Sequence, residues 1–310
     1  MADPAQRLTT TDVVLQGLRG RKTDVRSLLF EGALLFCILV SLAVLVTLLA
    51  DVVRGGWEVF SERGVGFLKG NLSSLPEFAG VAQGIIGSLL LMAFVVVIAF
   101  PLGIGAAVYL EEYAPDTKLT RLINVNIRNL AGVPSIVYGL LGLAIFVKLL
   151  AGVTGGRSVI AGGATLAILV LPIVIITSAE ALRAVPSSIR EAGYGVGATR
   201  WEVIRSHVLP SAAPGILTGT VLSISRALGE TAPLIMVGAV TGFLAGGGQT
   251  LNEMLHGKFT ALPMIIYGWA RQPSEGFRAN TAAAIVVLLV VILTANALAI
   301  FLRNRYERKW

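Results

Sequence analysis

An arginine and a glutamate stand four residues apart inside an otherwise apolar stretch, 211–233. On a helix, Arg226 and Glu230 would share one face, because residues i and i+4 are neighbours there. The guanidinium stays charged at every relevant pH and offers a planar fork of donors that suits phosphate oxygens. A charge within hydrocarbon costs about 2.5 kcal/mol or more, so both residues are candidates for a path through which an anion passes.

We expect this contact to be weak and transient, because tight binding would slow release of the anion. Glu230 would hold Arg226 when no anion is present, and a passing anion would displace part of that interaction. The hydroxyls of Ser225 and Thr231 would add donors. The alternative is a purely structural ion pair between packed helices.

A polar, glycine-rich segment at 180–210, here called the docking segment, lies between two long apolar runs. Its charged residues include Arg190, Arg200, Glu202 and Arg205. Glycine permits a sharp bend at 195–197, so we predict two short helices, the second running over about 200–207 and ending before Pro210. Such an elbow could insert into a cleft on a partner and transmit a push. The alternative is a solvated loop between helices.

The chain shows no catalytic constellation and no nucleotide site of its own. No G-x-x-x-x-G-K-[ST] pattern is present, because around Gly257-Lys258 the first glycine is replaced by Asn252 and the Ser or Thr by Phe259. The two histidines are far apart and have no cysteine partners, so we predict no metal site. If transport is driven by ATP, the energy must arrive from a separate chain through the docking segment.

The composition is that of an integral membrane protein. Of 310 residues, 55% are hydrophobic and 14% are charged, with a mean hydropathy of +0.79, whereas a soluble domain carries roughly 25% charged residues. The net charge of +7 agrees with Lys and Arg gathered on the cytoplasmic side of a membrane protein, so nucleic acid is not needed to explain it. The single cysteine, Cys37, excludes an intrachain disulfide.

Six apolar runs are long enough to cross a bilayer. We therefore predict an all-α integral membrane fold with six transmembrane helices at 32–50, 84–110, 130–147, 158–179, 211–243 and 279–302. Gly229 and Pro233 should break or kink the fifth helix and free backbone groups to face a cavity. Between the spans we expect a short amphipathic helix within 54–82 and an interfacial or re-entrant element at 259–270.

Six spans place both termini on one side of the membrane, and the basic residues choose the side. With the termini in the cytoplasm, cytoplasmic segments hold 16 Lys and Arg and the opposite segments hold 8. This bias favours cytoplasmic termini. We expect cytoplasmic tails at 1–29 and 303–310 around a transmembrane domain at 30–302.

The docking segment resembles the EAA loop of ABC importer permeases. That pattern runs Glu-Ala-Ala, three residues, Gly, nine residues, Ile, one residue, Leu-Pro. Here the matching positions are, in order, Glu191, Ala192, Gly193, Gly197, His207, Leu209 and Pro210. The spacing fits throughout, with Gly193 in place of Ala and His207 in place of Ile. The resemblance implies that this segment, including Arg200 and Glu202, docks on a cytoplasmic ATP-binding subunit.

Four further stretches resemble the permeases of phosphate-specific (Pst) importers, and the resemblance covers roughly 80–300. They read PLGIG with YLEEY within 101–113, LAGVPSIVYGL at 130–140, ALRAVP at 181–186 and SRALGETAP at 225–233. The Gly-Glu-Thr-Ala-Pro form is more similar to the PstA-type subunit than to its PstC-type partner. The resemblance implies the type I ABC importer permease fold, inorganic phosphate as substrate, and the inner or plasma membrane of a prokaryote.

The resemblance also implies partners, because one six-helix unit encloses only half of a pathway. They are a second, PstC-like permease, two ATP-binding subunits that use ATP and Mg, an extracytoplasmic phosphate-binding protein, and membrane lipid. No cofactor is expected on this chain. ATP binding would close the ATPases, move the docking segment and turn the cavity outward to accept the anion.

Two other interpretations use the same features. A sulfate or molybdate permease has the same architecture and differs in the anion, although the SRALGETAP stretch argues against it. A secondary transporter or channel would work alone on a gradient and would make the EAA spacing a coincidence. Inverted repeats would support that class, and the sequence shows none.

Overall fold

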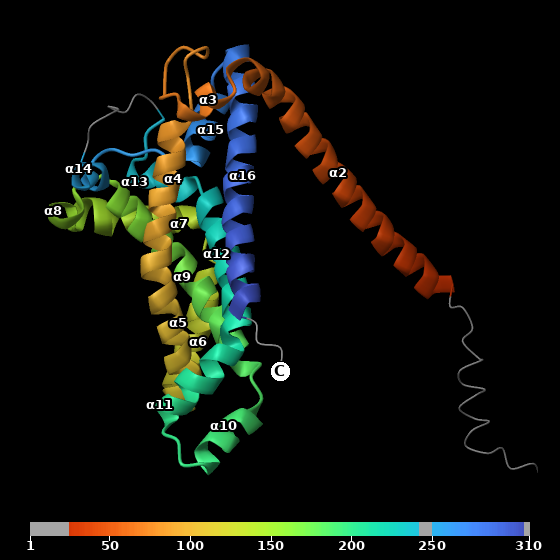
Figure 1. The fold of residues 1–310 in the computed structure, drawn as a ribbon, viewed down its shortest axis with the longest axis vertical. Coiled ribbons are helices and arrows are strands. Elements are labelled where there is room, and N and C mark those ends of the chain that lie inside the picture. Colours follow the sequence, from red (N-terminus) through yellow and green to blue (C-terminus); the bar gives the residue numbers. More distant parts are fainter. Residues whose placement is uncertain (1–24, 242–249, 307–310) are drawn as a thin grey trace, which may run out of the picture. The chain divides into compact units, whose positions relative to one another are not determined.

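The structure is a computed structural model that describes residues 25–241 and 250–306, and every regular element in those ranges is a helix (Figure 1). In chain order these are α2 (Val25–Arg63), α3 (Val65–Lys69), α4 (Ala82–Phe94), α5 (Phe100–Val108), α6 (Lys118–Ala131), α7 (Ser135–Gly142), α8 (Ala151–Thr154), α9 (Val159–Arg183), α10 (Ser187–Gly195), α11 (Arg200–Val203), α12 (Leu209–Gly229), α13 (Ala232–Val237), α14 (Leu251–His256), α15 (Leu262–Ala270) and α16 (Glu275–Tyr306). The same ranges contain the π-helical turns η1 (Val95–Ala99), η2 (Tyr109–Tyr113), η3 (Leu143–Leu149) and η4 (Ile204–Val208). Predictions for most of the two tails and for the end of the fifth span fall on 1–24, 307–310 and 242–243, which lie outside the described residues.

Helices long and apolar enough to cross a membrane account for most of the described chain. Five qualify, and a sixth is obtained if the bent pair formed by α6 and α7–η3 counts as one span. The five are Val25–Arg63, Ala82–Tyr113, Val159–Arg183, Arg200–Gly229 and Glu275–Arg305. The predicted all-α membrane fold is confirmed.

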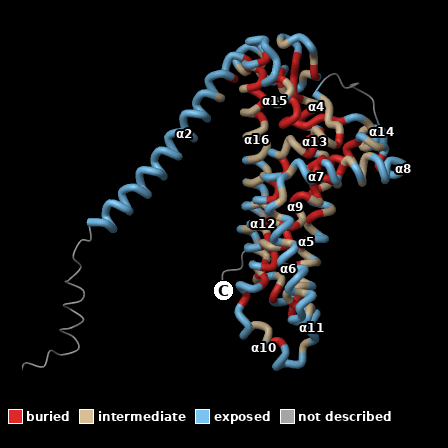
Figure 2. The backbone as a smooth tube through the Cα atoms, turned by 180° about the vertical axis from the view of Figure 1, so that it is seen from behind, coloured by how far each residue is buried: buried red, intermediate tan, exposed pale blue. Residues whose placement is uncertain are grey.

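The first of the chain's two units is Met1–Asp51, and its described part is residues 25–51 of α2. These residues are largely apolar and all are exposed (Figure 2). With 39 residues, α2 is about 58 Å long, whereas the hydrocarbon core of a bilayer is about 30 Å thick. The predicted span 32–50 is therefore the most apolar part of a longer helix.

In the second unit, Val52–Trp310, α9 is the central helix. It packs against α4, α5 and α12, and α12 packs in turn against α16 (Figure 1). The contact between α9 and α12 is close: a Cβ on Gly215 would lie 2.7 Å from Ala181 Cβ, so glycine is needed there. The long helices α4, α12 and α16 of this unit run along one direction, with α10 and α11 at one end and α3 and α15 at the other, while α7 and α8 run across them.

The predicted third span, 130–147, differs in the structure. The chain forms α6 and then α7–η3, whose axes make an angle of 101°. Pro134 is the N-cap of α7, with φ −55° and ψ 137°. The helix α6 ends before it, because a proline disfavours helix in the residue that precedes it and cannot donate a backbone bond. The bend turns α7 across the unit toward α13, where a Cβ on Gly139 would lie 2.7 Å from Pro233 Cα.

The expectation that the second helix of the docking segment ends before Pro210 is wrong. The helix that begins at Arg200 runs through η4 and α12 to Gly229. Pro210 falls in the first turn of α12, directly after the π-helical turn, and proline is tolerated where its missing N–H is not needed. The bend at 195–197 is present: α10 ends at Gly195, and Gly197 has a φ of +85°.

The mixed region 54–82 forms the end of α2, the short α3 and an irregular segment, which close one end of the second unit with α15. Arg63 holds this segment by donating to Pro76 O at 3.0 Å and to Ala79 O at 2.6 Å. Phe67 and Trp269 pack under it with ring centroids 6.3 Å apart. The apolar piece predicted at 259–270 contains α15, whose nine residues are too few to cross a bilayer.

Candidate anion path and docking segment

Arg226 and Glu230 form an ion pair at the end of α12. Arg226 lies in the last turn of the helix, and Glu230 follows as its C-cap with extended backbone angles. Arg226 Nε lies 3.2 Å from Glu230 Oε1. The arginine side chain is 41% exposed and that of the glutamate 17%, so the chain's own residues leave one side of the guanidinium open to a further ligand.

A break in the helix creates this arrangement. Gly229 ends α12, and α13 begins only at Ala232 with Pro233 in its first turn. The predicted break is therefore confirmed. Thr231 lies at the break, half-buried, and its hydroxyl makes no hydrogen bond with any residue in 25–241 or 250–306. The break thus brings a glutamate and an unpaired hydroxyl next to the arginine.

Ser225 lies beside the pair, but its hydroxyl is already engaged. It lies 2.9 Å from Asn296 Oδ1 of α16 and 3.0 Å from Val221 O. Ser225 therefore links α12 to α16, and an anion would have to compete with Asn296 for its proton. Sequence reasoning missed Asn296, although an amide in an apolar run is a signal for such a contact between helices.

Tyr138 of α7 is a second residue that the sequence analysis did not single out as part of this site. Its side chain is largely buried, and its hydroxyl donates to Leu130 O at 2.8 Å. It lies within electrostatic range of the Arg226 guanidinium. Because α7 packs against α13, the bend at Pro134 brings α7 next to the helix that follows the break.

The docking segment forms a compact elbow of α10 and α11. Gly193 lies where the two helices meet, and a Cβ there would be 2.6 Å from Val203 Cγ2. Thr199 and Glu202 form a capping box at the start of α11: Thr199 N donates to Glu202 Oε2 at 2.7 Å, and Glu202 N donates to Thr199 Oγ1 at 3.4 Å. Glu202 thus has a local structural partner, and the T-x-x-E spacing is a signal that would have found it.

The other residues predicted for docking lie on the surface of the elbow or at its exit. Glu191, Ala192 and Arg200 are exposed, and Gly197 makes the turn between the helices. Leu209 and Pro210 begin α12 and are not on the elbow itself. Exposed large side chains that the sequence analysis did not select surround the turn: Tyr194, Val196 and Trp201. An exposed apolar turn of this kind is typical of a surface that a partner covers.

One continuous helical run connects the two candidate sites. Arg200–Gly229 carries the docking residues Arg200, Glu202, Leu209 and Pro210 at its start and Arg226 in its last turn. Among the residues that the structure describes, no group of three or more His, Cys, Asp or Glu could hold a metal ion. The groups that this arrangement offers to a ligand are the partly exposed guanidinium of Arg226 and the hydroxyl of Thr231.

Residues 99–310 match the family described as "Binding-protein-dependent transport system inner membrane component". The chain belongs to this family. Its relatives include the phosphate transport system permease protein PstA 1 of Mycobacterium tuberculosis, with 36% identity over 81% of this chain and 76% of the relative. The phosphate transport system permease protein PstC of Pasteurella multocida is 30% identical over 91% of this chain and 93% of the relative. The chain is thus a multi-pass inner-membrane permease of the ABC transporter class.

Solved structures agree on the fold. A bacterial ABC transporter involved in the import of the acidic polysaccharide alginate aligns with 94% of this chain and 100% of its own, with a TM-score of 0.61 and 15% identity. At that identity the likeness concerns the fold alone. It confirms the predicted permease architecture of an ABC importer.

Proposed function

We propose that this chain is one of the two permease subunits of an ATP-driven importer of inorganic phosphate. The observation that carries the proposal is the Arg226–Glu230 ion pair, in which the guanidinium lies at a helix break and stays 41% exposed. An arginine fork suits phosphate oxygens, and its neighbouring glutamate can hold it between passages. The names of the relatives support phosphate as the substrate.

The family match and the similarity to a PstC permease support the remaining assembly. A second, PstC-like permease completes the pathway, and the open side of Arg226 faces it. Two ATP-binding subunits, which use ATP and Mg, bind the docking segment, and a phosphate-binding protein delivers the anion on the other side. This chain binds no cofactor and catalyses no reaction. Both termini, the docking segment and the tails at 1–29 and 303–310 lie in the cytoplasm, around the transmembrane domain at 30–302.

In this mechanism the anion passes Arg226 without stopping for long. The guanidinium exchanges part of its interaction with Glu230 for phosphate oxygens, and the free hydroxyl of Thr231 adds a donor. When the anion leaves, Glu230 recovers the arginine. Because the arginine is never left unpaired, its stay in the membrane is less costly throughout the cycle.

The test is reconstitution of the complete complex in proteoliposomes, with the binding protein outside and ATP enclosed on the side of the ATPase subunits. We expect uptake of labelled phosphate that requires ATP and that a tenfold excess of sulfate does not reduce. That outcome requires phosphate to be preferred by well over tenfold, which is more than about 1.4 kcal/mol of selectivity. Competition by sulfate would assign the chain to a different anion. Uptake by this chain alone, without ATP, would overturn the proposal.

A further inference from the structure

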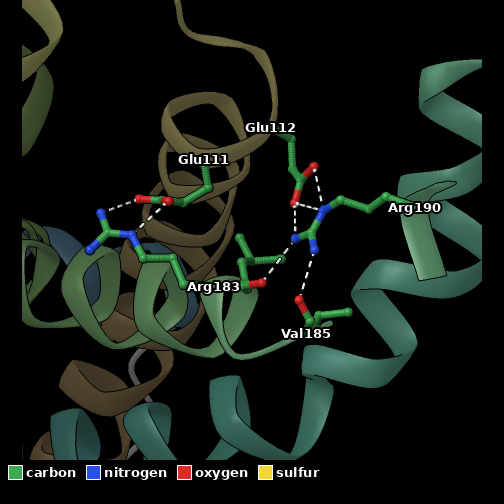
Figure 3. Close-up of polar contacts among 6 residues, drawn as sticks. Glu111, Glu112, Arg183, Val185 and Arg190 are labelled. Atoms are coloured by element: carbon green, nitrogen blue, oxygen red, sulfur yellow. Dashed lines mark hydrogen bonds and ion pairs between the residues drawn. The ribbon is translucent and has the colours of Figure 1, made fainter. Parts of the chain in front are cut away.

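Three consecutive residues at the end of the second span each contact an arginine of the docking segment, and Figure 3 shows the contacts of the first two. Glu111 accepts from Arg183, with Nε–Oε2 at 2.7 Å and a second bond from Nη2 to Oε1. Glu112 accepts from Arg190, with Nη2–Oε1 at 2.6 Å. The guanidinium of Arg200 lies over the ring of Tyr113, 5.1 Å from its centroid. We name these three contacts the η2 clamp.

The contact between Glu112 and Arg190 is the most enclosed of the four ion pairs in the described chain. The glutamate side chain is 5% exposed and the arginine 22%. Arg190 also donates from Nη1 to Val185 O at 2.8 Å and from Nη2 to Leu182 O at 3.0 Å. One side chain of α10 therefore holds the carbonyls at the end of α9 and the carboxylate at the end of η2.

The η2 clamp adds direction to contacts that are otherwise apolar. Beneath it, Ala107 of α5 belongs to a buried cluster with Leu182, Val203 and Val208. Apolar contacts of this kind are non-directional and tolerate sliding. A bidentate arginine–carboxylate pair fixes both distance and orientation, so the clamp sets where α10 and α11 lie on the end of the second span.

The energetic cost of burying charges also indicates that the Glu112–Arg190 pair serves to position the helices and not to stabilise the fold. Removing two charges from water costs several kcal/mol per ion, and a well-packed apolar pair often serves stability equally well. The π-helical turn at 109–113 points the same way, because such turns occur frequently at functional sites. The second span is otherwise joined to the docking segment only by packing, since the chain enters that segment from α9 and leaves it into α12.

We propose that the η2 clamp ties the second span, Ala82–Tyr113, to the docking segment, so that a movement of α10 and α11 moves this span together with α9 and α12. Glu112 and Arg190 are its main positioning residues. The inference rests on the proposed function, because it concerns how an ATPase subunit bound to the docking segment drives the pathway. It predicts that loss of the clamp uncouples ATP hydrolysis from transport.

The test measures phosphate uptake and ATP hydrolysis on the same proteoliposomes of the complete complex. Glu112→Gln should lower the number of phosphate ions imported per ATP by about tenfold, within the range found for changes in coupling networks. Arg190→Gln should have the same effect, and the double variant no more than either. Arg190→Lys keeps the charge but not the fork, so the ratio should fall between wild type and Arg190→Gln.

Asp116→Asn is the matched control, because it makes the same acid-to-amide change four residues further on. Its ion pair with Arg121 has side chains 76% and 70% exposed, so the ratio should stay at the wild-type value. If Glu112→Gln prevents assembly, Glu111→Gln decides, because its partner Arg183 is 46% exposed; its ratio should fall in assembled complexes.

A wild-type ratio of phosphate to ATP in the assembled clamp variants would overturn the inference, even if their yield is low. Full restoration of the ratio by Arg190→Lys would also contradict it, because charge alone would then be sufficient. Absence of ATP-dependent phosphate uptake in the wild-type complex would instead refute the proposed function. The two failures are therefore distinguishable in one experiment.

Discussion

Gly193 tests how tightly the two helices of the docking segment are packed. A Cβ on this residue would lie 2.6 Å from Val203 Cγ2 and 3.2 Å from Cγ1. Val203 is fully buried, and a β-branched side chain has few alternative rotamers. The related loop pattern has alanine at this position, so Gly193→Ala is both the smallest steric change and a return to that pattern.

Two opposing effects decide the result of Gly193→Ala. Alanine in a helix interior is about 1 kcal/mol more favourable than glycine. Overpacking of a buried contact costs about 1–3 kcal/mol. Because the valine cannot turn away, the cost of overpacking should exceed the gain in helix propensity. We expect a net destabilisation of up to about 2 kcal/mol, which is the largest overpacking cost less that gain.

The assay is thermal unfolding of the purified complex, together with ATP-dependent phosphate uptake. Val203→Ala alone should also destabilise the complex, because it leaves a cavity. In Gly193→Ala/Val203→Ala the new methyl group occupies part of that space, so the double variant should be more stable than the sum of the single changes predicts. Stabilisation by Gly193→Ala, with additive single effects, would refute the packing argument.

Three other predictions concern the path and the surface. Arg226→Gln should abolish most phosphate uptake while assembly and ATP hydrolysis remain, and normal uptake would return the ion pair to a structural role. Gly139→Ala should reduce uptake by displacing α13, because its Cβ would lie 2.7 Å from Pro233 Cα; a thermal midpoint and uptake at the wild-type level would contradict this contact. Arg121 holds the pKa of Asp116 below its usual range, so this pair stabilises the protein above the ordinary carboxyl pKa and the effect is lost as pH falls through the lowered value. The thermal midpoints of wild type and Asp116→Asn should therefore differ slightly at neutral pH and converge in acid, and a difference that grows in acid would show the opposite sign.

The length of apolar runs predicted most of the fold, because a bilayer sets a minimum length for any helix that crosses it. The length of a run could not predict the direction in which its helix lies relative to its neighbours. The third run, 130–147, lies mostly in α7–η3, and the chain turns by 101° at Pro134 between this segment and α6, which precedes it. At Pro210 the rule that a helix ends before a proline was wrong, because this proline falls just after a π-helical turn in a helix that continues to Gly229.

The candidate site was only partly accessible from the sequence for a similar reason. Spacing placed Glu230 next to Arg226, since neighbours at i+4 meet on one helix face. No periodicity relates Ser225 to Asn296, which lies 71 residues away, or Glu112 to Arg190, which lies 78 residues away. In the sequence, Glu111 and Glu112 directly follow the predicted span 84–110, and their partners became evident only when the helices were placed together.

The uninterrupted helix Arg200–Gly229 has a consequence for timing. At about 1.5 Å per residue, Arg226 lies about 39 Å along the axis from Arg200. A helix is stiff over such a length, so a shift or twist imposed at one end reaches the other without an intermediate conformational step. A nucleotide event at the partner and a change around the anion would then be simultaneous and not sequential. The π-helical turn η4 and Pro214 inside α12 are places along this run where a helix can bend, and their stiffness would set how much of the imposed movement arrives at the arginine.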